Sequence, residues 1–287
     1  MDTDLNTPWP APAKLNRFLH IVGRRADGYH LLQTLFQFLD IADYLSFTPR
    51  DDNQIVRHGG LAALDPEQDL CVRAARLLQQ RYASQAGIDV HIDKRLPAGA
   101  GLGGGSSDAA TTLVALNHYW HLGLSLTELA DLGLSLGADV PIFVLGQAAW
   151  AEGVGEQLTP VALDEPWFVV VVPACQVNTR EVFANPDLTR NTPALKICAS
   201  VPPEAGNDCE AVVLRRYPAV SAAAAWLSAY GQARMTGTGS CVFAAFPDRK
   251  QAEAVLAQRP AGLAGFVSRG CNRSLLHQRL QSDIMGR

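Results

Sequence analysis

The segment PAGAGLGGGSSDAA, Pro97 to Ala110, has the composition of a loop that binds phosphate. Five of seven consecutive residues are glycine, and two serines, an aspartate and an alanine-rich run follow. Glycine loses more conformational freedom on folding than any other residue, so such clustering is favoured only where the backbone must approach another group closely. A glycine turn that leads into a helix directs several backbone N–H groups and the positive end of the helix dipole at one point, which stabilises an anion. We predict a phosphate-binding loop of Pro97, Ala98, Gly99, Ala100, Gly101, Leu102, Gly103, Gly104, Gly105, Ser106 and Ser107, with a helix from about residue 106.

Other glycine loops fit this segment less well. A P-loop needs a lysine after its second glycine, and none follows here. Gly99, Gly101 and Gly104 satisfy GxGxxG, but a dinucleotide-binding fold needs an acid at a strand end about twenty residues on. This chain has YWHLGLSLTE there, between two expected helices, and it contains no HRD or DFG triplet of a protein kinase. An ordinary glycine-rich turn remains the alternative, and the serines at the expected helix start favour phosphate binding over it.

The composition indicates a well-packed soluble protein. The 287 residues are enough for two domains, with 48% hydrophobic and 18% charged residues. Acids and bases are interspersed at a net charge of −4, which favours neither nucleic acid nor a membrane surface as a partner. The first residues lack the basic start and apolar run of a signal peptide, and the longest apolar run, 167–174, is too short to cross a bilayer. Six scattered cysteines favour reduced thiols, so we expect a cytoplasmic protein without structural metal.

The elements that must position the loop alternate between strands and helices. In the first half we expect strands at 15–23, at 43–49 and from 87, and helices at 69–82, 106–121 and 125–137. Asp69 is a plausible N-cap, and Ser125 and Glu128 form a capping box. The next segment, ADVPIFV, is expected to hold one acid, Asp139, before an apolar strand. The second half reads as an α+β sandwich that includes a valine strand from 167, helices at 208–216 and 221–229 and a glycine turn at 236–240.

Three motifs resemble those of the GHMP small-molecule kinases in order and spacing: PAKLN (Pro12–Asn16), the glycine loop and TGTGSCVF (Thr236–Phe243). RADGYHLLQTLFQFLD and LGADVPIFV resemble the branch of this superfamily whose acceptor is a cytidine-diphosphate sugar alcohol. The resemblance covers essentially the whole chain and is weakest at 50–67 and 190–206. It implies an α+β fold of two domains: an ATP-binding, ribosomal-protein-S5-like domain at 1–160 and a ferredoxin-like domain at 161–287, with the active site between them.

This resemblance also implies a reaction. It is the ATP- and Mg²⁺-dependent phosphorylation of the 2-hydroxyl of 4-diphosphocytidyl-2-C-methyl-D-erythritol, which gives the 2-phosphate and ADP in the non-mevalonate isoprenoid pathway. The matching motifs make Asp139 the catalytic base and Lys14 its charged partner. A carboxylate helps a hydroxyl to attack by accepting its proton, and a nearby ammonium stabilises charge on the transferred phosphoryl group. Without the resemblance, Asp139 would be read as a turn residue and Lys14 as a solvated charge.

The remaining site residues follow from the same resemblance. Asn16 matches an amide that faces the substrate, Tyr29 and Phe183 match aromatics on opposite faces of the cytosine, and His30 matches its hydrogen-bonding partner. Stacking of a base on an aromatic ring is worth about 1–3 kcal/mol. From the residues alone, Tyr29 and Phe183 would be core aromatics. The sequence leaves the magnesium ligands open, and the hydroxyl of Ser107 is a candidate.

Two positions depart from the family pattern. Asp69 stands where an asparagine is usual, so it either alters adenine recognition or serves only as an N-cap. Arg180 stands where a proline is usual, so the loop that carries Phe183 could be oriented differently. The alternatives to this kinase are a catalytically silent nucleotide sensor, a related kinase of homoserine or mevalonate and, least favoured, a nicotinamide dehydrogenase. The sequence predicts no particular oligomeric state.

Overall fold

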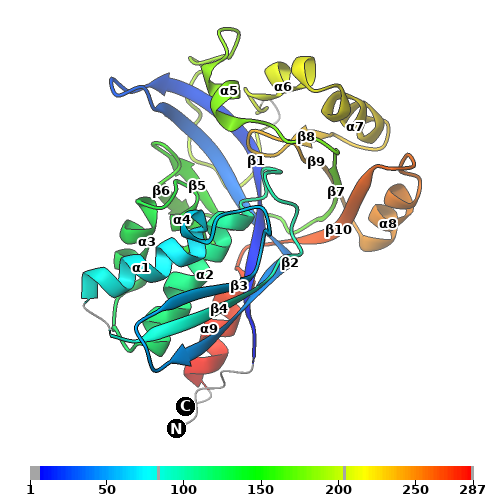
Figure 1. Cartoon of the computed structure of the whole chain (residues 1–287). Coiled ribbons are helices and arrows are strands. Elements are labelled where there is room, and N and C mark those ends of the chain that lie inside the picture. The colour runs from blue at the N-terminus through cyan, green and yellow to red at the C-terminus, as the bar shows by residue number, and fades with distance from the viewer. Residues whose placement is uncertain (1–6, 83–84, 203–204, 286–287) are drawn as a thin grey trace.

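The computed structural model describes residues 7–82, 85–202 and 205–285, so part of the segment examined for a signal peptide lies outside the described residues (Figure 1). The strands are β1 (Trp9–Arg24), β2 (His30–Arg50), β3 (Ile55–Gly59), β4 (Gly87–Asp93), β5 (Ala149–Glu152), β6 (Gln157–Pro160), β7 (Trp167–Val172), β8 (Arg234–Met235), β9 (Val242–Phe246) and β10 (Ala264–Cys271). The helices are η1 (Pro66–Gln68), α1 (Leu70–Tyr82), α2 (Gly104–Tyr119), α3 (Leu126–Leu134), α4 (Val140–Leu145), α5 (Thr179–Ala184), α6 (Glu210–Arg216), α7 (Pro218–Ser228), α8 (Arg249–Ala257) and α9 (Leu275–Met285).

Strand β2, 21 residues long, joins the two halves of the molecule. It pairs with β1, β4 and β5 in the first half, and its Phe38 and Leu39 pair with Cys271 and Gly270 of β10. Beyond β10 the sheet continues through β7 and β9 to β8. Strands β3 and β4 are parallel, and the other strand pairs of the described residues are antiparallel. The long strand therefore holds the glycine loop and the C-terminal sheet in one frame.

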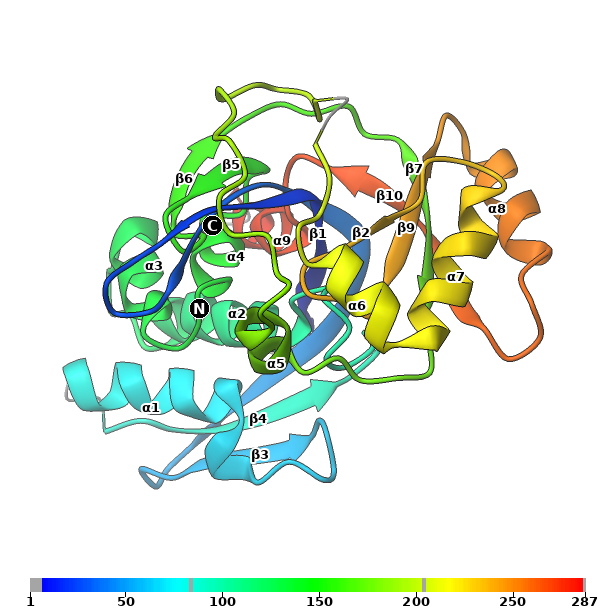
Figure 2. The ribbon, with the colours of Figure 1, turned by 90° about the horizontal axis from the view of Figure 1, so that it is seen from above.

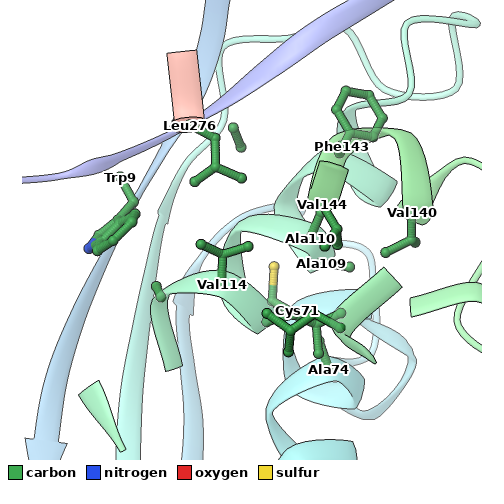
Figure 3. Packing of buried hydrophobic residues seen from close by; sticks show 14 of the residues in the cluster. Trp9, Cys71, Ala74, Ala109, Ala110, Val114, Val140, Phe143, Val144 and Leu276 are labelled. Atoms are coloured by element: carbon green, nitrogen blue, oxygen red, sulfur yellow. The ribbon is translucent and has the colours of Figure 1, made fainter. Parts of the chain in front are cut away.

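The first core lies between the β1–β4 strands and helices α1, α2, α3, α4 and α9. Helix α2 buries Ala109, Ala110 and Ala115, whose small side chains let neighbouring helices approach closely. In Figure 3, Leu276 of α9 points toward the same packed region as Trp9 of β1 and Val114 of α2. The C-terminal helix thus completes the core that supports the loop.

Strand β7 is buried on both faces because successive side chains of a strand point to opposite sides of the sheet. Val169 and Val171 face the core formed with α6, α7 and α8, whereas Phe168 and Val170 face a third cluster with Leu15 and Ala100. This arrangement explains the continuous apolar run in the sequence. The third cluster packs the glycine loop onto the C-terminal sheet.

Segments from each half contribute to the core of the other half. Leu19 and Ile21 of β1 lie in the second core, and Leu276 lies in the first. Seen from above in Figure 2, β1 and β2 run between α1–α4 on one side and α6–α8 on the other. The predicted division into 1–160 and 161–287 stays a prediction.

Most expected elements are confirmed, but ADVPIFV is not a strand. Residues 140–145 form α4, with Pro141 in its first turn and Gly146 at φ 65° as its C-cap. Proline suits the first turn because its missing N–H needs no partner there, and glycine suits the left-handed cap. The capping box of Ser125 and Glu128 is present as predicted, and α2 begins at Gly104, slightly before the expected start.

Candidate active site

The glycine loop packs directly against the turn at 236–240. Gly101 has φ 82°, and a Cβ atom there would lie 2.3 Å from the carbonyl oxygen of Thr236, so no larger residue fits. The hydroxyl of Thr236 donates to the carbonyl of Gly101 at 3.3 Å, and the N–H of Cys241 donates to the carbonyl of Ala100 at 3.1 Å. These contacts bring two of the three sequence motifs together.

The start of α2 has the features of an anion site. The first N–H groups of a helix have no partner within it, and no side chain of the described residues caps them here. Gly104, Gly105 and Ser106 line a cavity, and a Cβ atom on Gly105 would meet only Leu70 Cδ1, at 3.7 Å. The sixteen residues of α2 supply an aligned dipole. The backbone is thus open to a phosphate group at this point.

Lys14 is held rigidly beside this helix start. Its Nζ lies 3.3 Å from Oδ2 of Asp139 and donates to Oδ1 of Asn16 at 2.5 Å and to the carbonyl of Gly101 at 3.1 Å. The ammonium also lies over the ring of Phe36, 5.4 Å from its centroid. The Lys14 side chain is 3% exposed and that of Asp139 35% exposed. The cation is therefore fixed, and the carboxylate remains open to the cavity.

Asn16 links Lys14 to both neighbouring motifs. Its backbone N–H donates to the hydroxyl of Thr236, and its side-chain amide donates to the hydroxyl of Thr34, each at 3.0 Å. The backbone N–H of Lys14 donates to the carbonyl of Leu102 in the loop at 3.0 Å. β1 therefore places both polar side chains at the junction of the loop and the 236–240 turn.

The cavity has a volume of about 1020 Å³. Its walls are the glycine loop, Lys14, Asn16 and Asp139 at one end and Tyr29, His30 and Phe183 at the other. Pockets for one drug-sized ligand typically have about 300–1,000 Å³. The volume of this cavity lies just above that range.

The structure places the predicted base-binding aromatics differently from the expectation. The ring of Phe183 stacks on His30, with centroids 5.0 Å apart and planes inclined by 26°, rather than facing Tyr29 across a gap. Tyr29 is 64% exposed at the tip of the β1–β2 hairpin, where Arg24 Nε donates to the carbonyl of Gly28. Phe183 therefore packs part of its ring face against His30, whereas Tyr29 lines the cavity with most of its ring exposed.

Sequence reasoning missed a charged cluster beneath the loop. Lys94 Nζ contacts Oδ2 of Asp43 at 2.5 Å and Oδ2 of Asp108 at 2.8 Å, and Asp43 accepts from the N–H groups of Arg95 and Leu96. Burial, opposed by Lys94, raises the pKa of Asp108 to about 7. Burial acts to lower the pKa of Lys94, but the two carboxylates outweigh it and the pKa is raised. The sequence signal for this cluster was Asp108, an acid on the buried side of the alanine-rich helix α2.

Of the two departures, Asp69 has a clear structural role. Its Oδ1 accepts from the N–H of Cys71 at 2.9 Å, which caps α1 as predicted, and its Oδ2 pairs with Arg57 at 2.9 Å. Before Arg180, the hydroxyl of Thr179 bonds to that of Thr238 at 2.8 Å, which ties α5 to the glycine turn. Arg180 itself lines the cavity.

The side chains around the loop fit a magnesium ion that is coordinated mainly by substrate phosphates, rather than one coordinated by protein ligands alone. The described residues contain no cluster of three or more His, Cys, Asp or Glu with metal-binding geometry. Mg²⁺ commonly takes one or two carboxylates together with substrate phosphates, and Asp139 presents such a carboxylate beside the loop. Ser107 fits less well, because its side chain is fully buried and does not line the cavity.

Known proteins match the chain along nearly its whole length. The model described as GHMP kinases N terminal domain matches residues 69–147, and that described as GHMP kinases C terminal matches residues 194–264. The 4-diphosphocytidyl-2-C-methyl-D-erythritol kinase of Nitrosococcus oceani is 59% identical over 268 residues, covering 93% of this chain and 96% of that protein. The chain belongs to the 4-diphosphocytidyl-2-C-methyl-D-erythritol kinase family. As a member of this family it is an ATP-dependent kinase.

Solved structures confirm the fold of this kinase family. A crystal structure of 4-(cytidine 5'-diphospho)-2C-methyl-D-erythritol kinase is similar with a TM-score of 0.77 and 32% identity, covering 92% of this chain and 99% of that one. The mevalonate kinase of Methanococcus jannaschii has a TM-score of 0.68 at 16% identity, covering 93% of this chain and 98% of that one, and shares the fold. The predicted α+β GHMP kinase fold is confirmed. In the described part of the chain, no helix is both long and apolar enough to cross a membrane.

Proposed function

We propose that this kinase transfers the γ-phosphoryl group of ATP to the 2-hydroxyl of 4-diphosphocytidyl-2-C-methyl-D-erythritol, giving the 2-phosphate and ADP. The observation that carries the proposal is the pair of Lys14 and Asp139, with 3.3 Å between Nζ and Oδ2, at the wall of the cavity beside the start of α2. A relative of that name with 59% identity supports the choice of acceptor. We place this reaction in the non-mevalonate isoprenoid pathway and in the cytoplasm. The binding partners of the kinase are then small molecules.

Asp139 acts as the general base in this proposal. Its partly exposed carboxylate accepts the proton of the acceptor hydroxyl while the hydroxyl oxygen bonds to the γ-phosphorus. The bond from that phosphorus to the bridging oxygen breaks, and ADP leaves with the electron pair. Lys14 stabilises charge on the transferred group, and Asn16 and the Gly101 carbonyl keep its ammonium in place.

The two substrates occupy opposite ends of the cavity. The N–H groups at the start of α2 and the loop of residues 97–107 hold the phosphates of ATP. When bound with ATP, magnesium would neutralise part of the phosphate charge and would be held mainly by phosphate oxygens, which leaves the Asp139 carboxylate free to accept the proton. Tyr29, His30 and Phe183, which line the cavity, hold the cytosine at the other end.

The decisive experiment measures ADP release with magnesium and ATP for three acceptors in parallel. These are 4-diphosphocytidyl-2-C-methyl-D-erythritol, mevalonate and homoserine, and phosphorus NMR identifies the product. We expect turnover with the cytidine substrate alone and the signal of a new phosphomonoester. Turnover with mevalonate or homoserine instead would overturn the choice of acceptor, and ATP binding without turnover would favour a silent nucleotide sensor.

A further inference from the structure

Arg190 connects the two walls at the nucleobase end of the cavity. Its Nε donates to Nε2 of His30, at the start of β2, with a distance of 3.1 Å. Its other two nitrogens donate to three backbone carbonyls of the segment that carries Phe183: Leu188 at 3.0 Å, Phe183 at 2.9 Å and Asn185 at 2.6 Å. All three guanidinium nitrogens are thus engaged, and the residue lies behind the cavity wall rather than in it.

These contacts determine the chemical state of His30. A guanidinium group is always protonated and only donates, so Nε2 of His30 must be the acceptor in this bond. The ring proton of the neutral imidazole then resides on Nδ1, because an imidazolium ion has no accepting nitrogen. Burial, together with the positive charges of Arg190 and Arg24, lowers the pKa of His30, which favours the same neutral form.

The same side chain fixes the stacked rings. Helix α5 ends at Ala184, and the bond from Arg190 to the carbonyl of Phe183 satisfies one of the free carbonyls of its last turn. Cations are favourable at this end of a helix. Because Arg190 binds His30 at the same time, it sets the spacing between the hairpin and α5, and with it the stack of His30 and Phe183.

We propose that Arg190 is a positioning residue for nucleobase recognition: it holds His30 as the neutral tautomer with the proton on Nδ1, so that the cavity wall offers a base one hydrogen-bond donor beside an aromatic face. This inference rests on the proposed function for the identity of the base. The ligand that fits is a pyrimidine with an accepting edge, which cytosine supplies through N3 and O2. Arg190 acts through His30 and touches neither the base nor the reacting atoms.

Nitrogen-15 NMR of histidine-labelled protein reads the tautomer directly. In the wild-type protein at pH 7.5 we expect His30 with a protonated Nδ1 and an unprotonated Nε2. In Arg190→Met, which has no donor, we expect a shift toward the Nε2–H form. Arg190→Lys retains a donor and should keep the wild-type tautomer in part. A protonated Nε2 of His30 in the wild-type protein overturns the proposal, and this result does not depend on the folding of any variant.

Calorimetric titration with CDP and with ATP then tests the consequence for binding. Arg190→Met should bind CDP about tenfold more weakly, because His30 then loses its buried hydrogen bond to the base. Its ATP affinity should change less than about twofold. Arg215→Met is the matched control, because it also replaces one arginine of the second half by methionine. Arg215 forms an exposed ion pair with Asp187 and does not line the cavity. Unchanged CDP affinity in Arg190→Met overturns the inference. Failure of the wild-type protein to bind CDP would instead count against the proposed function, while the tautomer measurement stands.

Discussion

The ammonium of Lys14 lies 3.3 Å from the carboxylate of Asp139, although one residue comes from β1 and the other immediately precedes α4. The contact depends on the glycine loop, because Lys14 also binds the carbonyls of that loop through its backbone N–H and its Nζ. A Cβ atom on Gly103 would lie 3.1 Å from Cε of Lys14 and 2.8 Å from Cζ of Phe143. The loop is therefore part of the support of the proposed catalytic pair as well as the expected phosphate site.

Asp139→Asn should abolish most turnover while substrate binding is retained. The amide keeps the size of the side chain but cannot accept a proton, and general base catalysis typically contributes about 10²–10⁴-fold. Steady-state kinetics and CDP titration give the two quantities. Asp131→Asn, an exposed acid on α3, is the control for the loss of one negative charge. Near-normal turnover of Asp139→Asn would remove this residue from the role of base.

Lys14→Met should lower kcat much more than it lowers thermal stability. Methionine retains most of the apolar stem, whereas the ammonium over Phe36, to which we assign the stabilisation of phosphoryl charge, is lost. Asp139 is partly exposed, so water replaces the ion pair in the variant. Comparison of kcat with the thermal midpoint separates the effects. A parallel loss of both would assign Lys14 a structural role.

Two loop glycines should respond differently to alanine. Gly105→Ala should fold with unchanged or slightly raised stability, because the new Cβ atom meets only Leu70 Cδ1 and alanine is favourable in a helix. Its ATP affinity should fall, because this backbone lines the cavity. Gly101→Ala should instead be destabilised, because its Cβ atom would lie 2.3 Å from the Thr236 carbonyl oxygen. ATP titration and thermal denaturation of both variants measure the contrast, and unchanged ATP affinity of Gly105→Ala would contradict the cradle.

Tyr29→Ala should weaken CDP binding by about tenfold and leave ATP binding and stability nearly unchanged. The ring is 64% exposed, so its removal leaves no cavity in the core. Tyr230→Ala is the control, because that ring contacts Trp226 outside the cavity. Equal losses of CDP and ATP affinity would mean that Tyr29 supports the hairpin rather than the base.

Stability should decline in mild acid because of His277 in α9. Burial, partly offset by a bond to the Val144 carbonyl, lowers the pKa of this histidine, so below its ordinary value of 6.5 the unfolded chain takes up the proton first. The free energy of unfolding therefore falls as the pH drops through this region. His277→Gln, which does not titrate, should show a smaller decrease between pH 7 and 5 by urea denaturation. An identical pH profile for both proteins would exclude His277 as the source.

Sequence patterns predicted the elements whose signals are local. The capping box of Ser125 and Glu128, the cap at Asp69 and the buried valine strand depend on neighbouring residues alone, and each is present. The segment after Asp139 was predicted wrongly because six apolar residues do not distinguish a buried strand from a short buried helix. Pro141 and Gly146, which start and end α4, were the signals that favoured the helix.

The sequence by itself determined the family, the fold and the candidate residues of the loop, because motif order and residue type are properties of the chain. Tertiary structure alone decided which of these residues meet. The distance between Lys14 and Asp139, the stack of His30 on Phe183 and the bond from Arg190 to His30 all join segments far apart in the chain. Such contacts depend on how β2 and the buried clusters hold the two halves together, and no local pattern encodes a distance between separate segments.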